Sequence, residues 1–264
     1  MNGPSAPSIR LGLFFLGLLF FLGLELVRPY RAATVPKFKR WVTNLSLAFF
    51  NSTVLALVFS NAALVAAAHA TSRRIGVLNL IDCPYWIKVA ATLLFMDFML
   101  YIWHLLNHAT PLLWRFHLVH HTDKNMDVST ATRFHIGELA LAAVIKISLV
   151  YFWGADPAGV IIFESLLVLT AQFQHSSLRI PWLFERILWL LFVPPSMHRI
   201  HHSVKIMERN SNYGTIFSLW DRFFGTLVKE VDQSGIVIGV GGHFDEKKLQ
   251  LHHLLALPLT PSAR

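Results

Sequence analysis

The sequence is short of charged residues and contains a single cysteine. Charged residues make up 14% of the 264 positions and hydrophobic residues 54%, whereas a typical soluble domain is about 25% charged. This composition argues against a soluble domain and indicates an integral membrane protein. Because Cys83 has no second cysteine to pair with, an internal disulfide and a cysteine-ligated metal or iron–sulfur site are both excluded.

Motifs for bound redox cofactors and for nucleic acid are also missing. No G-x-G-x-x-G fingerprint follows a strand pattern, and no haem motif is present. Any redox chemistry would therefore need electrons from a partner. The net charge of +8 comes from Lys and Arg residues dispersed between apolar runs, which argues against nucleic acid and favours anionic lipid headgroups or an acidic protein.

Long apolar runs predict an all-α, multi-pass transmembrane helical bundle with three spans plus a helical hairpin. The spans are expected at residues 11–27, 42–70 and 86–103. The hairpin is expected at 138–173, with its turn at the "GADP" of 154–157. Basic residues between the first two spans put that loop in the cytosol by the positive-inside rule. The two hairpin crossings then return the chain to the cytosolic side.

Histidines are grouped in these non-spanning segments. "HLLNH" repeats histidine at i, i+4, and "HLVHH" and "HRIHH" repeat it at i, i+3, i+4. On a helix, these spacings put side chains on one face, where imidazoles can turn toward one metal or two adjacent ones. The eight residues are His104, His108, His117, His120, His121, His198, His201 and His202.

The donor set predicts two metal ions. Imidazoles without cysteine suit iron, zinc or copper, and eight ligands are too many for one ion. We expect each H-x-x-H-H box to supply half of a ligand shell with open positions, as catalytic metals require. Nearby carboxylates that could orient the ligands or hold the structure together are Asp123, Asp127, Glu138 and Asp221. Isolated histidines expected outside the site are His69, His243, His252 and His253.

The boxes and their surroundings resemble the fatty acid hydroxylase, or sterol desaturase, superfamily of membrane-bound di-iron oxygenases, especially its bacterial-type sterol desaturase-like members. The similar sequence segments include "WRFHLVHHTDKNMDVSTATRFHIGE", "QFQHSSLRIP", "MHRIHHS" and "NYGTIFSLWDRFFGT", within residues 90–226. The resemblance implies a cytosolic histidine-rich helical cap over two irons, with O2 as oxidant and a lipid C–H bond as target. It also implies a bacterial inner membrane location, with the endoplasmic reticulum as the other possibility.

The resemblance extends the set of candidate site residues. It implies that the eight box histidines and His175 bind metal, and that His135 is either near the metals, as a ligand or as the partner of one, or a surface histidine. Some hydroxylases have further histidines just before the equivalent of His175, where this chain has Thr170 and Gln174. Asn212, Tyr213, Trp220 and Asp221 are expected to hold the cap together.

We therefore expect three regions in the chain. Residues 1–103 would form the amino-terminal transmembrane helices, 104–226 the histidine-box hydroxylase or desaturase region with its membrane hairpin, and 227–264 a cytosolic tail. The functional domain would cover about 90–226. The apolar stretch at 183–194 is too short to span and is expected to lie as a helix at the membrane interface.

The expected function is oxidation of a lipid, either sterol-like, fatty acyl or related, by hydroxylation or desaturation with O2 and two external electrons. The resemblance implies a donor such as cytochrome b5 or a ferredoxin with its reductase. Basic residues beside the boxes fit either an acidic donor or a face against anionic lipid. These are Lys124, Arg179, Arg186, Arg199, Lys205 and Arg209.

Two other functions are compatible with a histidine-rich membrane protein. One is a binuclear zinc hydrolase acting on lipid, and zinc could also occupy the site in purified protein. The other is a metal transporter or sensor, which should carry ionisable ligands within its spans. Iron content and O2 uptake with a reductant would distinguish the oxygenase from both.

Overall fold

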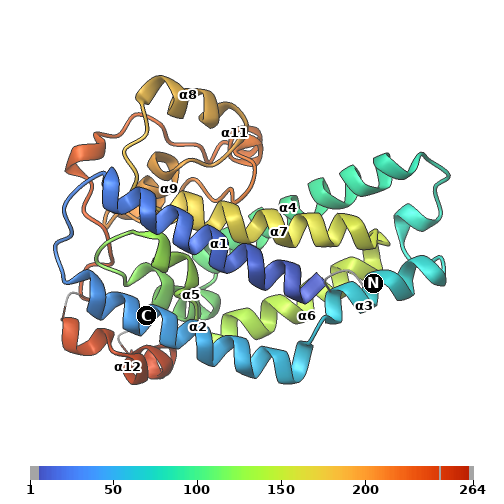
Figure 1. Ribbon diagram of the computed structural model, residues 1–264, viewed down its shortest axis with the longest axis horizontal. Helices are drawn as coiled ribbons and strands as arrows, with labels where there is room; N and C mark the ends of the chain where they lie inside the picture. Colours follow the sequence, from blue (N-terminus) through green and yellow to red (C-terminus); the bar gives the residue numbers. More distant parts are fainter. Residues whose placement is uncertain (1–5, 244, 262–264) are drawn as a thin grey trace.

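The computed structural model describes residues 6–243 and 245–261, which form a helical bundle with a cap at one end (Figure 1). Within the described residues, extended pairing is limited to isolated bridges such as Pro29–Leu178 and Ser203–Ile238. The predicted all-α class is confirmed. The α-helices are α1 Ala6–Val27, α2 Lys37–Phe59, α3 Ala62–Ser72, α4 Tyr85–Ala109, α5 Pro111–His121, α6 Ile136–Trp153, α7 Pro157–His175, α8 Trp182–Leu191, α9 Pro195–His201, α10 Ile206–Arg209, α11 Leu219–Phe224 and α12 Leu251–Ala256.

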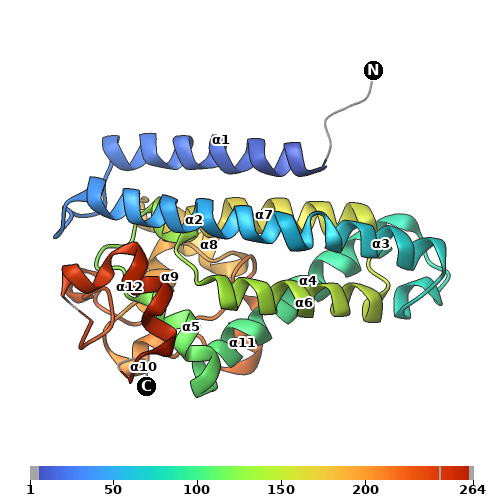
Figure 2. The same cartoon turned by 90° about the horizontal axis from the view of Figure 1, so that it is seen from below.

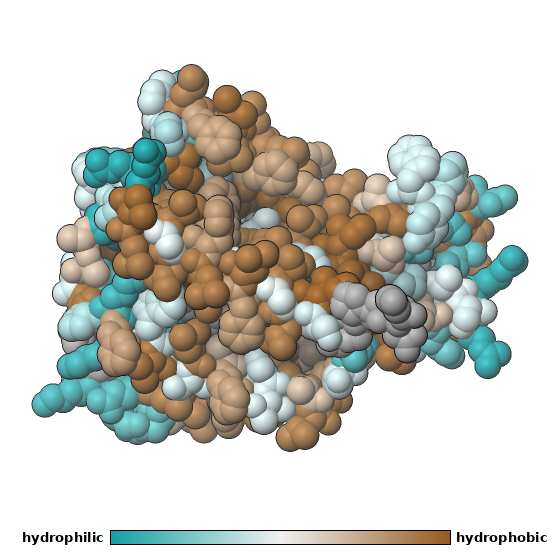
Figure 3. Space-filling view, in the orientation of Figure 1, coloured by the Kyte–Doolittle hydropathy of each residue, from teal (hydrophilic) through white to brown (hydrophobic). Residues whose placement is uncertain are grey.

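Five segments of the described chain are long and apolar enough to cross a membrane, as three spans plus a hairpin predict. They are Ser8–Val27, Lys37–Asn79, Tyr85–Ala109, Ile136–Trp153 and Pro157–His175. Much of their apolar surface faces outward, and Leu57 is 82% exposed. In Figure 3, hydrophobic residues cover the middle of the molecule and hydrophilic ones gather toward both ends of its long axis. This distribution suits a multi-pass membrane protein.

The hairpin turn follows directly from its sequence. Gly154 ends α6 in the left-handed conformation, with φ of 70°, which glycine adopts without steric cost. Asp156 then caps α7, because its Oδ1 accepts hydrogen bonds from the amides of Ala158 and Gly159 at 2.8 and 3.2 Å. Pro157 at the first helical position suits the start of a helix.

Three predicted boundaries differ from the structure. The second span, expected as one helix over 42–70, is interrupted between α2 and α3 by Asn61, whose φ of 54° lies in the left-handed region that Asn tolerates. The third helix does not end at residue 103 but continues to Ala109, so the boundary expected at 103/104 falls inside α4. The hairpin helices cover 136–175 rather than 138–173.

The cap contains α5 and the helices from α8 onward, together with short 3₁₀ segments (Figures 1 and 2). The 3₁₀ segments of the cap are η2 Val128–Thr132, η3 Gln233–Gly235, η4 Glu246–Leu249 and η5 Leu257–Leu259, whereas η1 Val77–Asn79 lies between α3 and α4 at the other end of the bundle. The region expected as a tail is anchored, because Leu254 and Leu257 pack in one cluster with Leu47 of α2 and Leu118 of α5. Its carboxy-terminal part therefore supports α5, the helix that carries His117, His120 and His121.

The helix α8 has the character expected of an interfacial helix. It has 10 residues, too few to span a membrane, and none of them is buried. Trp182, Phe184 and Leu190 are 65%, 56% and 68% exposed. An exposed apolar helix at the end of a transmembrane bundle fits the boundary between lipid and water.

Candidate metal centre

The structure brings the nine histidines predicted as ligands into two adjacent groups. The first, here the five-histidine group, contains His104, His108, His117, His121 and His201. The second, the four-histidine group, contains His120, His175, His198 and His202. In each group, one ring nitrogen from every member lies within 4.8 Å of the others. All nine are buried except His108, which is partly exposed.

Four helices supply these side chains. His104 and His108 lie in the last two turns of α4, and His175 is the final residue of α7. The two H-x-x-H-H boxes end the short helices α5 and α9. α4 packs against α5 and α7, and α7 packs against α9, so one end of the bundle becomes the common wall of both groups.

The first H-x-x-H-H box is divided between the groups. His117 and His121 point into the five-histidine group, whereas His120 points into the four-histidine group. Positions i and i+4 are separated by about 40° around a helix, but i+3 and i+4 by about 100°. A single helical turn can therefore serve two neighbouring sites.

The second box is divided in the opposite sense. His198 and His202 belong to the four-histidine group, and the middle residue, His201, belongs to the five-histidine group. The expectation that each box supplies half of a ligand shell did not say which histidine of a box faces which metal. Each box contributes to both groups, and the unequal angular spacing within a helical turn is the physical reason.

Main-chain carbonyl groups orient four of the rings. A carbonyl oxygen only accepts hydrogen bonds, so each of these rings must carry its proton on Nδ1 and keep a lone pair on Nε2. The contacts are His104 Nδ1 with Tyr213 O (2.8 Å), His120 Nδ1 with Arg133 O (3.1 Å), His175 Nδ1 with Ala171 O (2.6 Å) and His201 Nδ1 with Ser211 O (2.8 Å). The ring tautomers are thus set by the fold.

Side chains orient two further rings. Nδ1 of His117 lies 2.9 Å from Oε1 of Glu138, which is buried in the first turn of α6. Nδ1 of His108 lies 3.3 Å from Oδ1 of Asn210. Glu138 is thus the one of the four candidate carboxylates for which the structure shows a hydrogen bond to a clustered histidine. Carboxylates that hold metal-binding histidines act in this way.

The nitrogen atoms that remain fit metal ions. Nε2 atoms approach in pairs, with 3.2 Å between His117 and His121 and 2.9 Å between His175 and His198. Several buried ring nitrogens have no hydrogen-bond partner at all. These are Nε2 of His108 and His201, and Nδ1 of His121, His198 and His202. The converging atoms of His121, His198 and His202 are their Nε2 atoms. Nitrogen lone pairs that approach one another in a buried site are favourable when they surround a cation and costly otherwise.

The protonation state of these rings also suits a metal. Burial, reinforced by neighbouring imidazoles, holds the pKa of His120, His121 and His198 well below the ordinary value of histidine. The pKa values of His201 and His202 are lowered for the same reasons. Neutral imidazole is the form that binds metal, and an all-nitrogen set without cysteine suits iron, zinc or copper.

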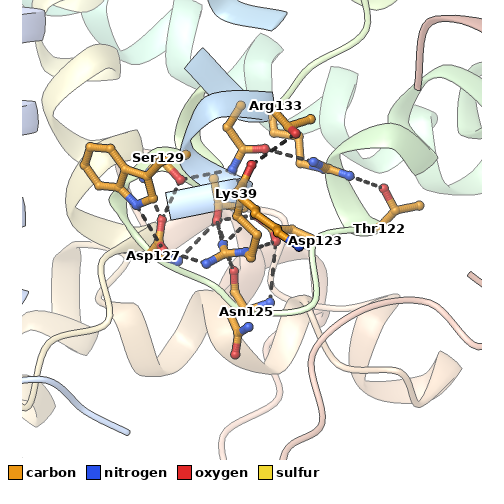
Figure 4. Close-up of polar contacts among 12 residues, drawn as sticks. Lys39, Thr122, Asp123, Asn125, Asp127, Ser129 and Arg133 are labelled. Atoms are coloured by element: carbon orange, nitrogen blue, oxygen red, sulfur yellow. Dashed lines mark hydrogen bonds and ion pairs between the residues drawn. The ribbon is translucent and has the colours of Figure 1, made fainter. Parts of the chain in front are cut away.

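The carboxylates Asp123 and Asp127 bind Arg40 instead of histidine. Figure 4 shows both carboxylates among their polar contacts. Arg40 Nε and Nη2 donate to Oδ1 and Oδ2 of Asp123 at 2.5 and 2.7 Å, and Nη1 donates to Asp127 at 2.7 Å. Burial alone would raise the pKa of Asp123, but the charge and hydrogen bonds of Arg40 lower it below its usual range. These carboxylates therefore join α2 to the loop after α5.

Arg133 connects this charged network to the histidines. Its buried guanidinium donates to Val119 O, Thr122 Oγ1 and Asn44 Oδ1 at 3.0, 2.9 and 2.8 Å. Its own carbonyl oxygen accepts the hydrogen bond from His120. The name Arg40–Arg133 network is used below for Arg40, Asn44, Asp123, Asp127, Thr130 and Arg133. Sequence reasoning missed Arg40, Asn44 and Arg133, because no local pattern links α2 to this loop.

Asp221 and His135 also lie outside both histidine groups. Asp221 accepts hydrogen bonds from the amides of Tyr213 and Gly214 at 2.8 and 2.7 Å, and so supports the turn whose carbonyl orients His104.

His135 caps α6 through Nδ1, which accepts from the Gly137 amide at 2.9 Å, and its Nε2 lies 3.1 Å from Leu255 O. Both ring nitrogens of His135 are thus occupied. The four isolated histidines His69, His243, His252 and His253 are absent from both groups.

Comparison with known proteins places this centre in context. The family model for fatty acid hydroxylase matches residues 89–226, which include all nine clustered histidines. The ornithine lipid hydroxylase OlsE of Rhizobium tropici is 32% identical over 160 residues, covering 60% of this chain and 47% of that protein. A cholesterol 25-hydroxylase-like protein of Danio rerio is 31% identical over 161 residues, 58% of each chain.

Human alkylglycerol monooxygenase is more distant. It is 27% identical over 171 residues, covering 61% of this chain and 36% of that protein. The matches thus span from about a third to somewhat over half of these relatives' own lengths. No solved structure matches the chain.

Proposed function

Because the chain belongs to the fatty acid hydroxylase family, we propose that it is a membrane-bound di-iron oxygenase that hydroxylates or desaturates a lipid with O2 and two external electrons. The observation that carries the proposal is the pair of adjacent, buried groups of five and four histidines. Nine ligands would leave positions free for exchangeable ligands if two ions of coordination number up to six shared them. The relatives act on ornithine lipid, cholesterol and alkylglycerol, as their names state, which supports a lipid substrate.

The protein residues hold, orient and enclose the centre. The nine histidines would hold the two irons, and the irons would supply the reduction of O2 and the attack on an unactivated C–H bond. Tyr213, Arg133 and Ser211 fix ring orientation through their carbonyl groups. Burial keeps bulk water from the reacting carbon. Since α4 and α7 carry ligands in their last turns, a lipid tail can reach the centre without leaving the membrane.

The location of the basic loop supports a cytosolic position for the cap. Tyr30, in the loop between α1 and α2, donates its amide to Ser177 O at 2.8 Å, two residues after His175. The loop and the histidines therefore share one end of the bundle. By the positive-inside rule this end faces the cytosol, where a reduced electron carrier is available. A bacterial inner membrane fits best, and the endoplasmic reticulum has the same sidedness.

The electron donor is a separate protein in this proposal, such as cytochrome b5 or a ferredoxin with its reductase. Exposed basic residues of the cap, including Lys205, could dock an acidic carrier. Arg199 is not part of such a surface. It is 3% exposed, lies 3.7 Å from the centroid of the Tyr30 ring, and donates to Gln233 at 2.7 Å.

Anaerobic reconstitution tests the proposal. Purified protein loaded with Fe²⁺ should bind about two irons per chain and consume O2 when given a reductant and a membrane lipid extract. The oxidised lipid should gain 16 mass units for hydroxylation or lose 2 for desaturation. Zinc-loaded protein that converts lipid without O2 would favour the binuclear zinc hydrolase instead. Metal flux in proteoliposomes without lipid oxidation would favour the transporter.

A further inference from the structure

A pocket of about 510 Å³ lies at the histidine-bearing end of α1 and α7. It is lined by Val27, Arg28, Pro29, Arg179, Ile180 and Pro181. Two arginines stand among four apolar residues, and no acidic residue lines the pocket. Neither guanidinium forms an ion pair or hydrogen bond with another described residue. Two arginines beside apolar walls match the chemistry of an anion attached to an apolar body.

Main-chain pairing holds the two arginines together. Pro29 and Leu178 form an antiparallel bridge, and the Arg179 amide donates to Arg28 O at 3.1 Å. The pocket is therefore built into the fold, although its arginine side chains are exposed. The two segments come from opposite parts of the sequence, and only the packing of α1 on α7 brings them together.

Nearby acidic groups do not neutralise the pair. Glu25, three residues before Arg28, accepts from the amides of Val128 and Ser177 through Oε1 and from Lys37 through Oε2. Glu185 of α8 accepts from the Ser196 amide. Within the described residues, neither carboxylate is therefore paired with Arg28 or Arg179. The positive charge of the pocket remains available to a ligand.

The location of the pocket matches the headgroup level of a bilayer. The first candidate span ends at Val27, immediately before Arg28. The exposed apolar helix α8 begins at Trp182, immediately after Pro181, at the same end of the bundle (Figure 1). Val27 and Ile180 can thus face hydrocarbon while the arginines face phosphate or carboxylate groups.

The residues of the pocket are also close in sequence to the clustered histidines. Arg179 follows the clustered His175 by four residues, and Tyr30, beside Pro29, packs under Arg199, the neighbour of His198. We propose that Arg28 and Arg179 bind the anionic headgroup of the lipid substrate, an inference that rests on the proposed function. The substrate class is then an acyl lipid with a phosphate or carboxylate headgroup, and uncharged sterols are disfavoured.

Binding should be measured with the full-length, iron-loaded protein in neutral detergent. The probes are short-chain phosphatidylglycerol, short-chain phosphatidylcholine and inorganic phosphate, each competing with a fluorescent phosphatidylglycerol. The test variant is R28Q/R179Q. Its matched control is R73Q/R74Q, which removes two exposed arginines from the loop after α3, at the other end of the bundle. Iron content, measured in parallel, shows whether each variant is folded around its metals.

We expect R28Q/R179Q to keep its iron and to bind phosphatidylglycerol roughly 10- to 30-fold more weakly, since each arginine adds about a factor of five at an anionic surface. The KM for a charged lipid should rise by a similar factor with little change in kcat. The control should match the wild type in both. Equal affinity of R28Q/R179Q and wild type for phosphatidylglycerol would overturn the inference, as would equal binding of phosphatidylcholine or competition by free phosphate at lipid-like concentrations.

Turnover separates this inference from the proposed function. If the wild type oxidises only uncharged lipids, the oxygenase proposal stands and the headgroup assignment fails. If binding depends on the arginine pair but no lipid is oxidised under any condition, the oxygenase proposal fails and the pocket remains a lipid site without the role of substrate selection.

Discussion

The two histidine groups and the Arg40–Arg133 network are neighbouring buried polar clusters that satisfy their polar atoms in different ways. In the network, Arg40 meets two carboxylates and the Arg133 guanidinium meets three oxygen atoms. In the histidine groups, five ring nitrogens have no partner. The first cluster is complete as a protein structure, and the second is complete only with a ligand.

This difference assigns the clusters different tasks. A buried charged network with all groups paired contributes a defined geometry. A buried group of neutral imidazoles with unused lone pairs contributes binding capacity. Arg133 belongs to both, since its side chain lies in the network and its carbonyl orients His120. The network therefore supports the candidate metal centre through the main chain.

Removing one ligand from each histidine group should have the largest effect. His120→Ala and His201→Ala each delete a buried Nε2 donor from a different group, so we expect lipid oxidation to fall by at least about 100-fold in each. Bound iron should drop from about two toward one per chain. Iron analysis by mass spectrometry and lipid product analysis measure the two quantities.

The matched control for these variants is His252→Ala. His252 is exposed, and its ring contacts that of His253 with 4.0 Å between the centroids and 38° between the ring planes. We expect wild-type iron and activity. Full activity in His201→Ala would contradict the assignment of the five-histidine group to a metal.

Breaking the charged network should destabilise the protein strongly. Arg40→Ala removes the ion-pair partner of the buried carboxylates of Asp123 and Asp127, and breaking a buried pair in this way costs about 3–5 kcal/mol. Arg40→Lys keeps the charge but loses the two-pronged contact with Asp123, so a smaller loss is expected. The apparent unfolding temperature in detergent measures both.

An exposed ion pair provides the control for the network. Lys205 Nζ lies 3.0 Å from Glu208 with its side chain 68% exposed, and such pairs contribute less than about 1 kcal/mol. Lys205→Ala should therefore unfold within a degree or two of the wild type. If Arg40→Ala behaved in the same way, the network would not have the supporting role described above.

Weakening one orienting contact should have a smaller effect than removing a ligand. Glu138→Gln replaces the carboxylate that holds His117 Nδ1 at 2.9 Å with a neutral acceptor of the same shape. We expect metal affinity to fall by about 10- to 100-fold while the protein stays folded. Titration with Co²⁺, followed by its absorption spectrum, measures affinity without turnover. An unchanged affinity would show that Glu138 does not tune this ring.

The sequence could predict the elements that depend on local spacing. Long apolar runs predict the five candidate spans, and histidines at i, i+3 and i+4 predict one-sided clusters. The crosswise division of the two boxes could not be predicted, because it depends on how α5 and α9 are rotated against each other. Only the packed structure contains that rotation.

Long-range partners were beyond sequence reasoning for the same reason. Asp123 could be noted as a carboxylate near the boxes, but its partner Arg40 is 83 residues away on α2. The resemblance to the fatty acid hydroxylase superfamily also suggested a position for His135 near the candidate metal centre, but it could not predict the contacts of His135. In the structure His135 bonds to the Gly137 amide and the Leu255 carbonyl, which a pattern of residue types does not reveal.

The smallest effect on stability and on bound iron is expected for a variant of His135. This variant tests whether a histidine whose ring nitrogens both have protein partners takes part in metal binding. His135→Ala removes the cap of α6 and the contact with Leu255, so stability should fall by about 1 kcal/mol. Because both ring nitrogens already have protein partners, bound iron should stay at the wild-type value. Iron per chain and the unfolding temperature should be measured on the same preparation. Loss of one iron in His135→Ala would show that a histidine with satisfied nitrogens can still bind metal, and would remove the distinction between the two kinds of cluster.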